Sequence, residues 1–414
     1  MENLFNDYVK SLETYIMFRI KQKAAELAPE LEKKGRAPIA LAMGAPVVAP
    51  PEFVTKKLTE ALALPDIHTY SSPRGEKFYL EAVAKRMKSR FGVELNPKTE
   101  IFSLIGSKEG LANFIRALIN PKTGEKERDI ILIPDPGYAS YKEMIKTNGG
   151  LGYPMPLVKE NNFMPDFDRV IENLKRDGFD EKKVKAVIIN YPGNPTGAVC
   201  TYEYLEKAVA FCKKRGILLI SDAAYCDIYF NEREKPHSVL EIEDAKDVAV
   251  EFFSFSKPYA MTGWRLGWVC GNEAAVNTFG KLKSTIDSGI FKAIQKAGAD
   301  VLNSKEGDEY IKEASCGFKK KQMILVNGLR ELGWKIDDSD IPKATFYLWL
   351  PVPERFSTSA EFTDALLKKS GIVAVPGIAF GENGEGMFRI SAVSTDEKLQ
   401  ECIDRMKADG FYFE

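Results

Sequence analysis

Residues 254–267 of the chain read SFSKPYAMTGWRLG and follow an apolar run of the kind that forms a buried strand. The stretch therefore begins where a strand ends, and ligands bind at the carboxyl ends of strands in open α/β sheets. Lys257 has apolar neighbours there, a setting that lowers the pKa of an amine and suits it to Schiff-base chemistry. Two serine hydroxyls and the guanidinium of Arg265 suit a phosphate. Taken alone, Lys257 could equally be a surface lysine after a strand.

Short β-branched runs alternate with helical patterns on both sides of this stretch. One helical pattern places apolar residues at positions 111, 114, 115 and 118. The alternation predicts an α/β fold with a seven-stranded, mostly parallel sheet covered by helices on both faces. The predicted strands are Ile101–Ile105, Asp129–Pro134, Gly152–Leu157, Val184–Asn190, Gly216–Ser221, Val248–Ser254 and Arg265–Cys270.

The pattern changes after about Leu282, where long amphipathic stretches precede three further strand-like runs, Thr345–Leu350, Gly371–Val375 and Met387–Ser391. This change predicts a second, smaller α+β domain. We expect residues 1–47 to form an N-terminal arm that joins the small domain. Residues 48–285 would form the large domain and residues 286–414 the small one.

Two further polar motifs follow predicted strands. The sequence SDAAY contains Asp222, whose carboxylate could keep a pyridine nitrogen protonated, and Tyr225, which could reach an oxygen on the same ring. Asp222 could instead cap the segment that follows it. The sequence YPGNPTG predicts a tight turn in which Asn194 offers an amide donor to a ligand, or a plain turn without a ligand.

Three other motifs suit a ligand with a phosphate, a ring and a carboxylate. The sequence GSKEG at residues 106–110 joins a strand to a helix, and helix N-termini bind phosphate, although many such turns bind nothing. Tyr138 could stack on a planar ring or be a packed surface tyrosine. Arg389 lies in an apolar run and needs an anionic partner, which is either a substrate carboxylate or a structural acidic residue.

The composition excludes several other classes of protein. Lys and Arg total 58 against 59 for Asp and Glu, so no basic excess indicates nucleic-acid binding. The two histidines and six scattered cysteines predict no metal site and no disulfide framework. The start, MENLFNDYVK, lacks the apolar core of a signal peptide, and no stretch is long enough for a membrane span. A cytoplasmic location is the resulting expectation.

As a set, the motifs SxSK with a following arginine, YPGNPTG and SDAAY resemble those of the class I/II aminotransferases, which are fold type I pyridoxal-phosphate enzymes. The similarity runs from about Leu41 to the C-terminus. It implies that pyridoxal 5'-phosphate is bound to Lys257 as a Schiff base and that the catalytic residues are Lys257, Asp222 and Tyr225. It also implies cofactor contacts from Ser107, Lys108, Tyr138, Asn194, Asp222, Tyr225, Ser254, Ser256, Lys257 and Arg265.

The resemblance further implies how the substrate binds and how the subunits assemble. The substrate α-carboxylate would bind Arg389 in a bidentate pair, with Asn194 and the backbone at Gly44 beside it. Tyr70 would reach the phosphate of the neighbouring subunit, so that the active site lies at a homodimer interface. The peptide bond before Pro195 is expected to be cis.

The prediction of the amino donor rests on only two features of the sequence. Lys108 and the segment Asp287–Gln295 look like those of the aspartate and LL-diaminopimelate branch, whereas Ala45 stands where that branch often has an acidic residue. Lys108 would contact the side chain of the substrate, or only the phosphate or solvent. We expect an aspartate- or diaminopimelate-like donor with 2-oxoglutarate as acceptor. A C–S β-lyase on the same scaffold is the alternative. A pyridoxal-phosphate-binding transcription regulator would carry an added N-terminal DNA-binding domain. This interpretation is disfavoured, because only about forty residues precede the core and they have no marked excess of basic side chains.

Overall fold

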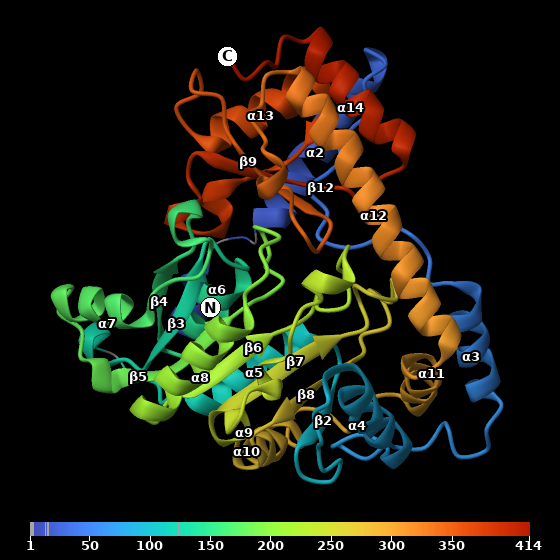
Figure 1. The fold of residues 1–414 in the computed structure, drawn as a ribbon, viewed down its shortest axis with the longest axis vertical. Helices are drawn as coiled ribbons and strands as arrows, with labels where there is room; N and C mark the ends of the chain where they lie inside the picture. The colour runs from blue at the N-terminus through green and yellow to red at the C-terminus, as the bar shows by residue number, and fades with distance from the viewer. Residues whose placement is uncertain (1–3, 13, 15, 123) are drawn as a thin grey trace.

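The computed structural model describes residues 4–12, 14, 16–122 and 124–414. Its centre is a seven-stranded sheet with the strand order β2-β8-β7-β6-β5-β3-β4, in which β8 runs antiparallel to both of its neighbours and all the other pairs are parallel (Figure 1). The strands are β2 (Ile101–Leu104), β3 (Ile130–Asp135), β4 (Leu151–Pro156), β5 (Val184–Ile189), β6 (Leu218–Asp222), β7 (Ala249–Ser254) and β8 (Gly267–Gly271). All seven predicted strands are thereby confirmed, with ends displaced by at most two residues.

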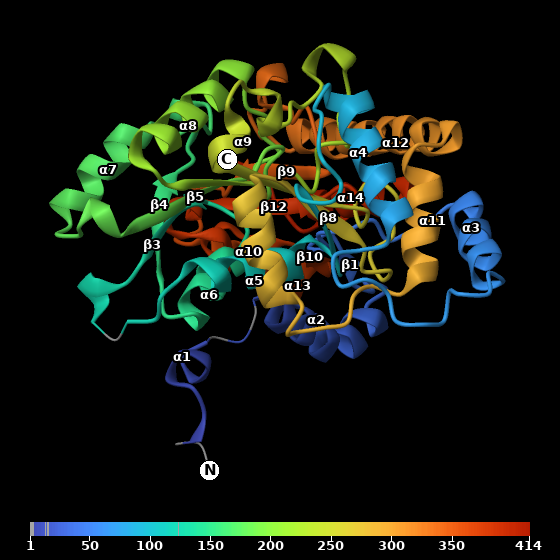
Figure 2. The same cartoon turned by 90° about the horizontal axis from the view of Figure 1, so that it is seen from below.

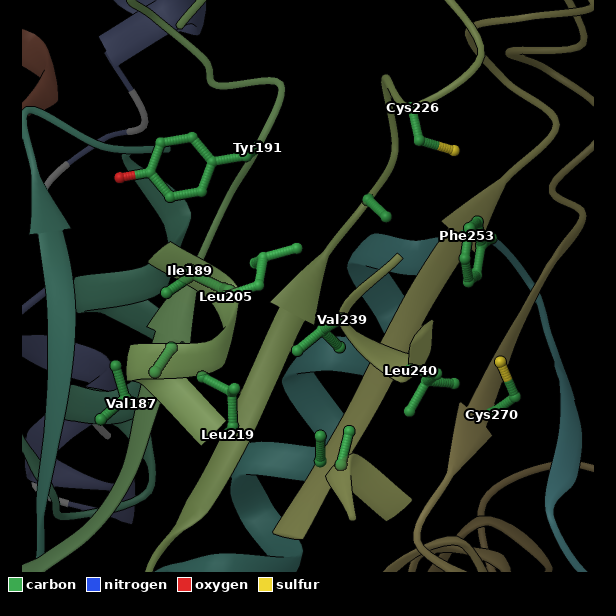
Figure 3. Close-up of a cluster of buried hydrophobic side chains, with 14 of the residues drawn as sticks. Val187, Ile189, Tyr191, Leu205, Leu219, Cys226, Val239, Leu240, Phe253 and Cys270 are labelled. Atoms are coloured by element: carbon green, nitrogen blue, oxygen red, sulfur yellow. The ribbon is translucent and has the colours of Figure 1, made fainter. Parts of the chain in front are cut away.

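Helices cover both faces of this sheet, because successive strand residues point to opposite sides and both sides are apolar. Ile188 and Ile220 pack on one face with α5 (Ser107–Leu118), α6 (Ser140–Thr147) and α10 (Glu273–Lys283). Ile189 and Leu219 pack on the other face with α4 (Lys77–Phe91), α7 (Phe167–Arg176) and α8 (Tyr202–Arg215). Figure 2 shows α5, α6 and α10 on one side of the sheet and α7 and α8 on the opposite side. Figure 3 shows part of the second cluster, where Leu205 of α8 lies over side chains of β5 and β6.

The helices of this part of the chain follow the predicted alternation with the strands. They are α3 (Glu52–Leu62), α4 (Lys77–Phe91), α5 (Ser107–Leu118), α6 (Ser140–Thr147), α7 (Phe167–Arg176), α8 (Tyr202–Arg215), α9 (Ala245–Val248), α10 (Glu273–Lys283) and α11 (Lys292–Leu302). Short 3-10 turns lie at Glu125–Glu127, Lys159–Asn161, Glu181–Lys183, Glu232–Glu234 and Val239–Glu241.

The C-terminal part has its own apolar core around Leu325, Trp334, Phe362 and Phe388. Its three-stranded antiparallel sheet has the order β11-β12-β9. The elements are α12 (Lys305–Glu331), β9 (Tyr347–Pro351), α13 (Ser359–Ser370), β10 (Ile372–Val373), β11 (Val375–Pro376), β12 (Met387–Ser391) and α14 (Asp396–Ala408), with 3-10 turns at Asp338–Asp340, Gly377–Phe380 and Glu382–Gly384.

The N-terminal segment contains α1 (Asp7–Lys10), α2 (Ile16–Lys33) and β1 (Ile39–Ala40). Its α2 and β1 pack on this C-terminal part, where β1 pairs in parallel with β10, whereas α1 contacts α6 of the large sheet's helical layer. Ala24 and Leu31 of α2 share a small apolar cluster with Val373 and Val375. The division at residue 285 stays a prediction; α11, which follows it, packs against α3 and α4 of the large sheet's helical layer (Figure 1).

Three further properties concern the described residues as a whole. None of their helices has the length and apolar character that a membrane span requires. They contain no group of three or more histidine, cysteine or acidic side chains arranged to hold a metal ion. All six cysteines are free thiols, of which Cys200 is partly exposed and Cys316 exposed.

Candidate active site

Lys257 lies three residues beyond the end of β7, in the turn that leads toward β8. The hydroxyl of Ser254 accepts the backbone N–H of Ser256 at 3.1 Å and shapes the start of this turn. The Lys257 ammonium donates to the carbonyl oxygen of Gly44 at 2.8 Å. Burial lowers the pKa of Lys257 to about 8, and the nearby charge of Arg265 acts in the same direction. A substantial fraction of this amine is therefore neutral near physiological pH.

Asp222 is the last residue of β6, and its carboxylate is buried. The Tyr141 hydroxyl donates to one carboxylate oxygen at 2.6 Å, and the backbone N–H of Ala224 donates to the other at 3.3 Å. Asn190 donates from its side chain to the Asp222 carbonyl at 2.7 Å. Burial raises the pKa of Asp222, while these donors and the charge of Lys257 oppose the rise. The site thus holds a rigid carboxylate that favours a cationic partner.

Arg389 reaches from β12 to the turn that follows β5. One of its terminal nitrogens donates to the Asn194 side-chain oxygen at 2.6 Å, and the other donates to the Ala42 carbonyl at 2.7 Å. Its Nε is buried without a hydrogen-bond partner, and no acidic side chain among the described residues forms an ion pair with it. A buried cation with only neutral partners is a setting that suits an anion.

Two tyrosine hydroxyls lie between Arg389 and Lys257. The Tyr225 hydroxyl is 2.6 Å from the Tyr347 hydroxyl, which also lies 3.3 Å from the Gly44 carbonyl oxygen. Burial raises the pKa of Tyr225 well above its ordinary value, so this phenol stays protonated. The Lys257 ammonium lies 5.9 Å from the centre of the Tyr225 ring.

A second positive corner forms where α5 begins. Arg265 donates to the Ser256 hydroxyl at 3.3 Å and to the Thr262 carbonyl at 2.9 Å. Gly106 precedes α5 with φ of +91°, and a Cβ on it would lie 2.0 Å from a terminal nitrogen of Arg265. Ser107 opens the helix, so its free N–H groups lie in the same corner as the guanidinium. This corner suits a phosphate dianion.

Tyr138, Lys108 and Tyr70 complete the predicted set. The Tyr138 ring packs edge-to-face on Tyr141, and the Lys108 ammonium lies 5.9 Å from the Tyr138 ring centre. Both side chains therefore flank the Asp222 end of the site. Tyr70 is 88% exposed and lines a separate pocket of about 470 Å³ together with residues 68, 69, 71 and 288–291. Within this chain it lies apart from the other predicted residues.

Three residues of the site were not predicted to belong to it, namely Tyr141, Asn190 and Tyr347. Asn190 and Tyr347 are buried polar residues within predicted strands, whereas Tyr141 lies in α6, where no motif in the sequence marks it. Asn190 ends a predicted strand, and its side-chain oxygen accepts the Asn194 N–H at 2.9 Å. The peptide bond between Asn194 and Pro195 is cis, as predicted, and the Tyr191–Pro192 and Asp135–Pro136 bonds are also cis.

Comparison with known proteins agrees with this geometry. The family model described as aminotransferase class I and II matches residues 36–406. An LL-diaminopimelate aminotransferase of Halothermothrix orenii is 40% identical over 413 residues and covers 100% of both chains. One from Aquifex aeolicus is 41% identical and covers 97% of this chain and 98% of its own.

Solved structures show the same fold. Substrate-bound BacF of Bacillus subtilis has a TM-score of 0.88 at 35% identity and covers 98% of this chain and 97% of its own. A double mutant of Thermus thermophilus aspartate aminotransferase has a TM-score of 0.86 at 25% identity and covers 98% and 99%. The chain therefore belongs to the class I and II aminotransferases, the pyridoxal-phosphate-dependent enzymes of amino-group transfer.

Proposed function

We propose that this aminotransferase takes its amino group from an L-amino acid with a second charged group, such as aspartate or LL-diaminopimelate, and uses 2-oxoglutarate as acceptor. The relatives of 40–41% identity that span the whole chain are LL-diaminopimelate aminotransferases. Lys108 lies beside Tyr138 and supplies a cation for the distal end of such a donor.

One observation carries the assignment of the reacting centre: Lys257 and Arg389 meet the same short backbone segment. Lys257 donates to the Gly44 carbonyl at 2.8 Å, and Arg389 donates to the Ala42 carbonyl at 2.7 Å. An α-amino acid carries its amine and its carboxylate on one carbon, so it needs a reactive amine and a cation only a few ångströms apart. A donor held in this way would present its Cα–H bond to Lys257.

The donor set fits pyridoxal phosphate. The cofactor and its substrate would supply partners for three groups of the site. These are the unpaired Nε–H of Arg389, the buried carboxylate of Asp222 and the Arg265 guanidinium packed against Gly106. When bound, the cofactor supplies an electron sink for the substrate Cα. We assign the contacts as follows: covalent attachment to Lys257, the ring nitrogen to Asp222, the ring oxygen to Asn194 and Tyr225, the ring face to Tyr138, and the phosphate to Ser107, Ser254, Ser256 and Arg265.

Each residue then has a defined chemical task. Asp222 keeps a proton on the nitrogen it faces, because a buried carboxylate stabilises an adjacent cation. Lys257 Nζ removes the proton from the donor Cα, a task its lowered pKa of about 8 permits near neutral pH. Arg389 holds the α-carboxylate in a bidentate pair, with Asn194 and Gly44 beside it.

Assembly as a homodimer would bring Tyr70 to the phosphate of the neighbouring site. Tyr70 is 88% exposed, and Leu64 in the same segment is more than 40% exposed. Ile286 and Phe291, in a second segment, are also each more than 40% exposed. These segments contact each other, since Lys292 donates to the Thr69 hydroxyl at 2.6 Å. Exposed apolar side chains gathered in two segments that contact each other are typical of a subunit interface.

The donor assignment is tested by measuring kcat/KM for aspartate, LL-diaminopimelate, alanine and phenylalanine with 2-oxoglutarate as acceptor. We expect the two charged donors to lead. Lys108→Met should lower their kcat/KM about tenfold or more, the effect of losing one charge-assisted contact, and leave alanine nearly unchanged. Lys108→Arg is the matched control that keeps the charge.

Turnover of alanine or phenylalanine without turnover of the charged donors would refute the assignment. Release of pyruvate and ammonia from a sulfur-containing amino acid, without any oxo acid present, would favour the lyase alternative instead.

A further inference from the structure

The Tyr347 hydroxyl connects the two halves of the active site. Tyr347 begins β9 and is fully buried. Its hydroxyl oxygen lies 2.6 Å from the Tyr225 hydroxyl and 3.3 Å from the Gly44 carbonyl oxygen, within hydrogen-bond distance of both. Tyr225 belongs to the cofactor side of the site, and Gly44 belongs to the substrate side, so one hydroxyl contacts both.

The backbone and the ring of Tyr347 are both fixed by contacts with neighbouring residues. Gln322 of α12 donates to the Tyr347 carbonyl at 3.0 Å, and the Tyr347 N–H donates to the Thr345 hydroxyl at 3.2 Å. The Arg389 guanidinium lies 4.4 Å from the ring centre. A Cβ at Gly44 would approach the Tyr347 hydroxyl to 3.1 Å, so the absence of a side chain there leaves room for it.

The distances indicate where the Tyr347 proton lies. The Tyr347 hydroxyl lies 2.6 Å from the Tyr225 oxygen and 3.3 Å from the Gly44 carbonyl, so Tyr225 is the nearer of these two acceptors. A hydroxyl has one proton, so if Tyr347 donates to Tyr225, the Tyr225 proton is free for another acceptor.

We propose that Tyr347 is a positioning residue that donates to Tyr225 and so directs the Tyr225 proton to the ring oxygen of pyridoxal phosphate. The inference rests on the proposed role of Tyr225. A hydroxyl that accepts a hydrogen bond becomes a stronger donor itself, by about 10–30% per bond. Lys257, Asp222 and Arg389 are the charged groups that also face Tyr225, and all three are kept in the test that follows.

The test uses the cofactor-loaded enzyme without substrate and follows its visible absorbance as a function of pH. A donor to the ring oxygen stabilises the anionic form of that oxygen, so losing or weakening the donor raises the pH midpoint. We expect Tyr225→Phe to raise the midpoint most. Tyr347→Phe, which keeps the ring beneath Arg389, should raise it by about 0.3 to 1 unit. The double variant should match Tyr225→Phe alone.

Steady-state kinetics supply a second readout. Tyr347→Phe should lower kcat several-fold and leave KM for the amino donor within about twofold, because the Arg389 contacts are retained. Tyr259→Phe is the matched control, since its hydroxyl is buried without a hydrogen-bond partner among the described residues. It should leave both the midpoint and kcat unchanged. Equal thermal midpoints of the cofactor-free proteins would establish that each variant is folded.

The possible outcomes separate the two levels of the argument. A midpoint that does not move in Tyr225→Phe refutes the role of Tyr225 and, with it, that of Tyr347. A shift in Tyr225→Phe without one in Tyr347→Phe overturns the Tyr347 assignment alone. Additive shifts in the double variant also overturn it, because Tyr347 would then act independently of Tyr225.

Discussion

At the scale of single residues, the reactivity of the site depends on Lys257 and its electrostatic surroundings. Burial and the charge of Arg265 lower its pKa to about 8, while the charge of Asp222 raises it. A lysine with its ordinary pKa of about 10.5 would be almost entirely protonated at neutral pH and could not attack a carbonyl. The apolar neighbours of Lys257 are therefore part of its chemistry as well as of the core.

This balance predicts the pH dependence of cofactor capture. The neutral amine is the reactive form, so the initial rate of covalent capture of pyridoxal phosphate by the cofactor-free protein should rise with pH through a midpoint near 8. At pH 7 the neutral fraction exceeds that of an ordinary lysine by roughly 300-fold. Capture is measured by cyanoborohydride trapping and peptide mapping of Lys257.

Asp222→Asn provides the matched variant for this measurement. It removes the charge that raises the Lys257 pKa, so the midpoint should move further down. A wild-type midpoint near 10.5, or an upward movement in Asp222→Asn, would contradict the electrostatic account.

At the scale of elements, the site is assembled by the ends of strands. The motifs that follow β2, β5, β6 and β7 supply Ser107, Asn194, Asp222 and Lys257 in turn. Parallel strands place their carboxyl ends at one edge of the sheet, so residues far apart in the sequence become neighbours there. The turn between β2 and α5 also positions Arg265, because only glycine at position 106 leaves space for its guanidinium.

Gly106→Ala tests this turn. Its φ of +91° and the 2.0 Å approach of the new Cβ to Arg265 should displace the guanidinium. We expect the affinity for pyridoxal phosphate to fall about tenfold or more, since such strain costs roughly 1–3 kcal/mol. The affinity is measured by equilibrium titration of the cofactor-free protein.

Gly216→Ala is the control for the cost of a positive φ alone. Gly216 ends α8 with φ of +62°, and a Cβ there meets nothing within 4 Å. This variant should lose some thermal stability and retain its affinity for the cofactor. Equal losses of affinity in both variants would rule out a specific role for the Gly106 turn.

At the scale of the whole molecule, the proposed substrate site lies where three parts of the chain meet. Arg389 comes from the C-terminal sheet, Asn194 from the large sheet, and the Ala42 carbonyl from the N-terminal segment. Near the same junction the Gly137 N–H donates to the Phe380 carbonyl at 2.8 Å, and the Asn383 N–H donates to the Asp135 carboxylate at 3.2 Å. Any movement between these parts would therefore change the carboxylate-binding geometry.

The proposed homodimer makes a prediction at the same scale. Lys257→Ala and Tyr70→Ala homodimers should each be strongly impaired, Lys257→Ala almost completely. In a mixed dimer, one site then carries both substitutions and the other carries neither, so activity should rise to about half the wild-type value per hybrid dimer. The measurement is the activity of differently tagged, co-purified hybrids.

An absence of recovery in those hybrids would place Tyr70 in the site of its own chain or outside the site. A chain that sediments as a monomer at working concentration would overturn the shared site directly.

The seven strands and the turns at their ends could be predicted from the sequence alone, because apolar periodicity and the positions of Gly and Pro are local signals. Lys257, Asp222 and Asn194 could be proposed for this reason. Which distant residues contact these side chains follows only from the tertiary structure. Gly44 is 213 positions from Lys257, and Tyr347 is 122 positions from Tyr225. Such contacts arise from packing three parts of the chain together, and no local pattern in the sequence encodes them.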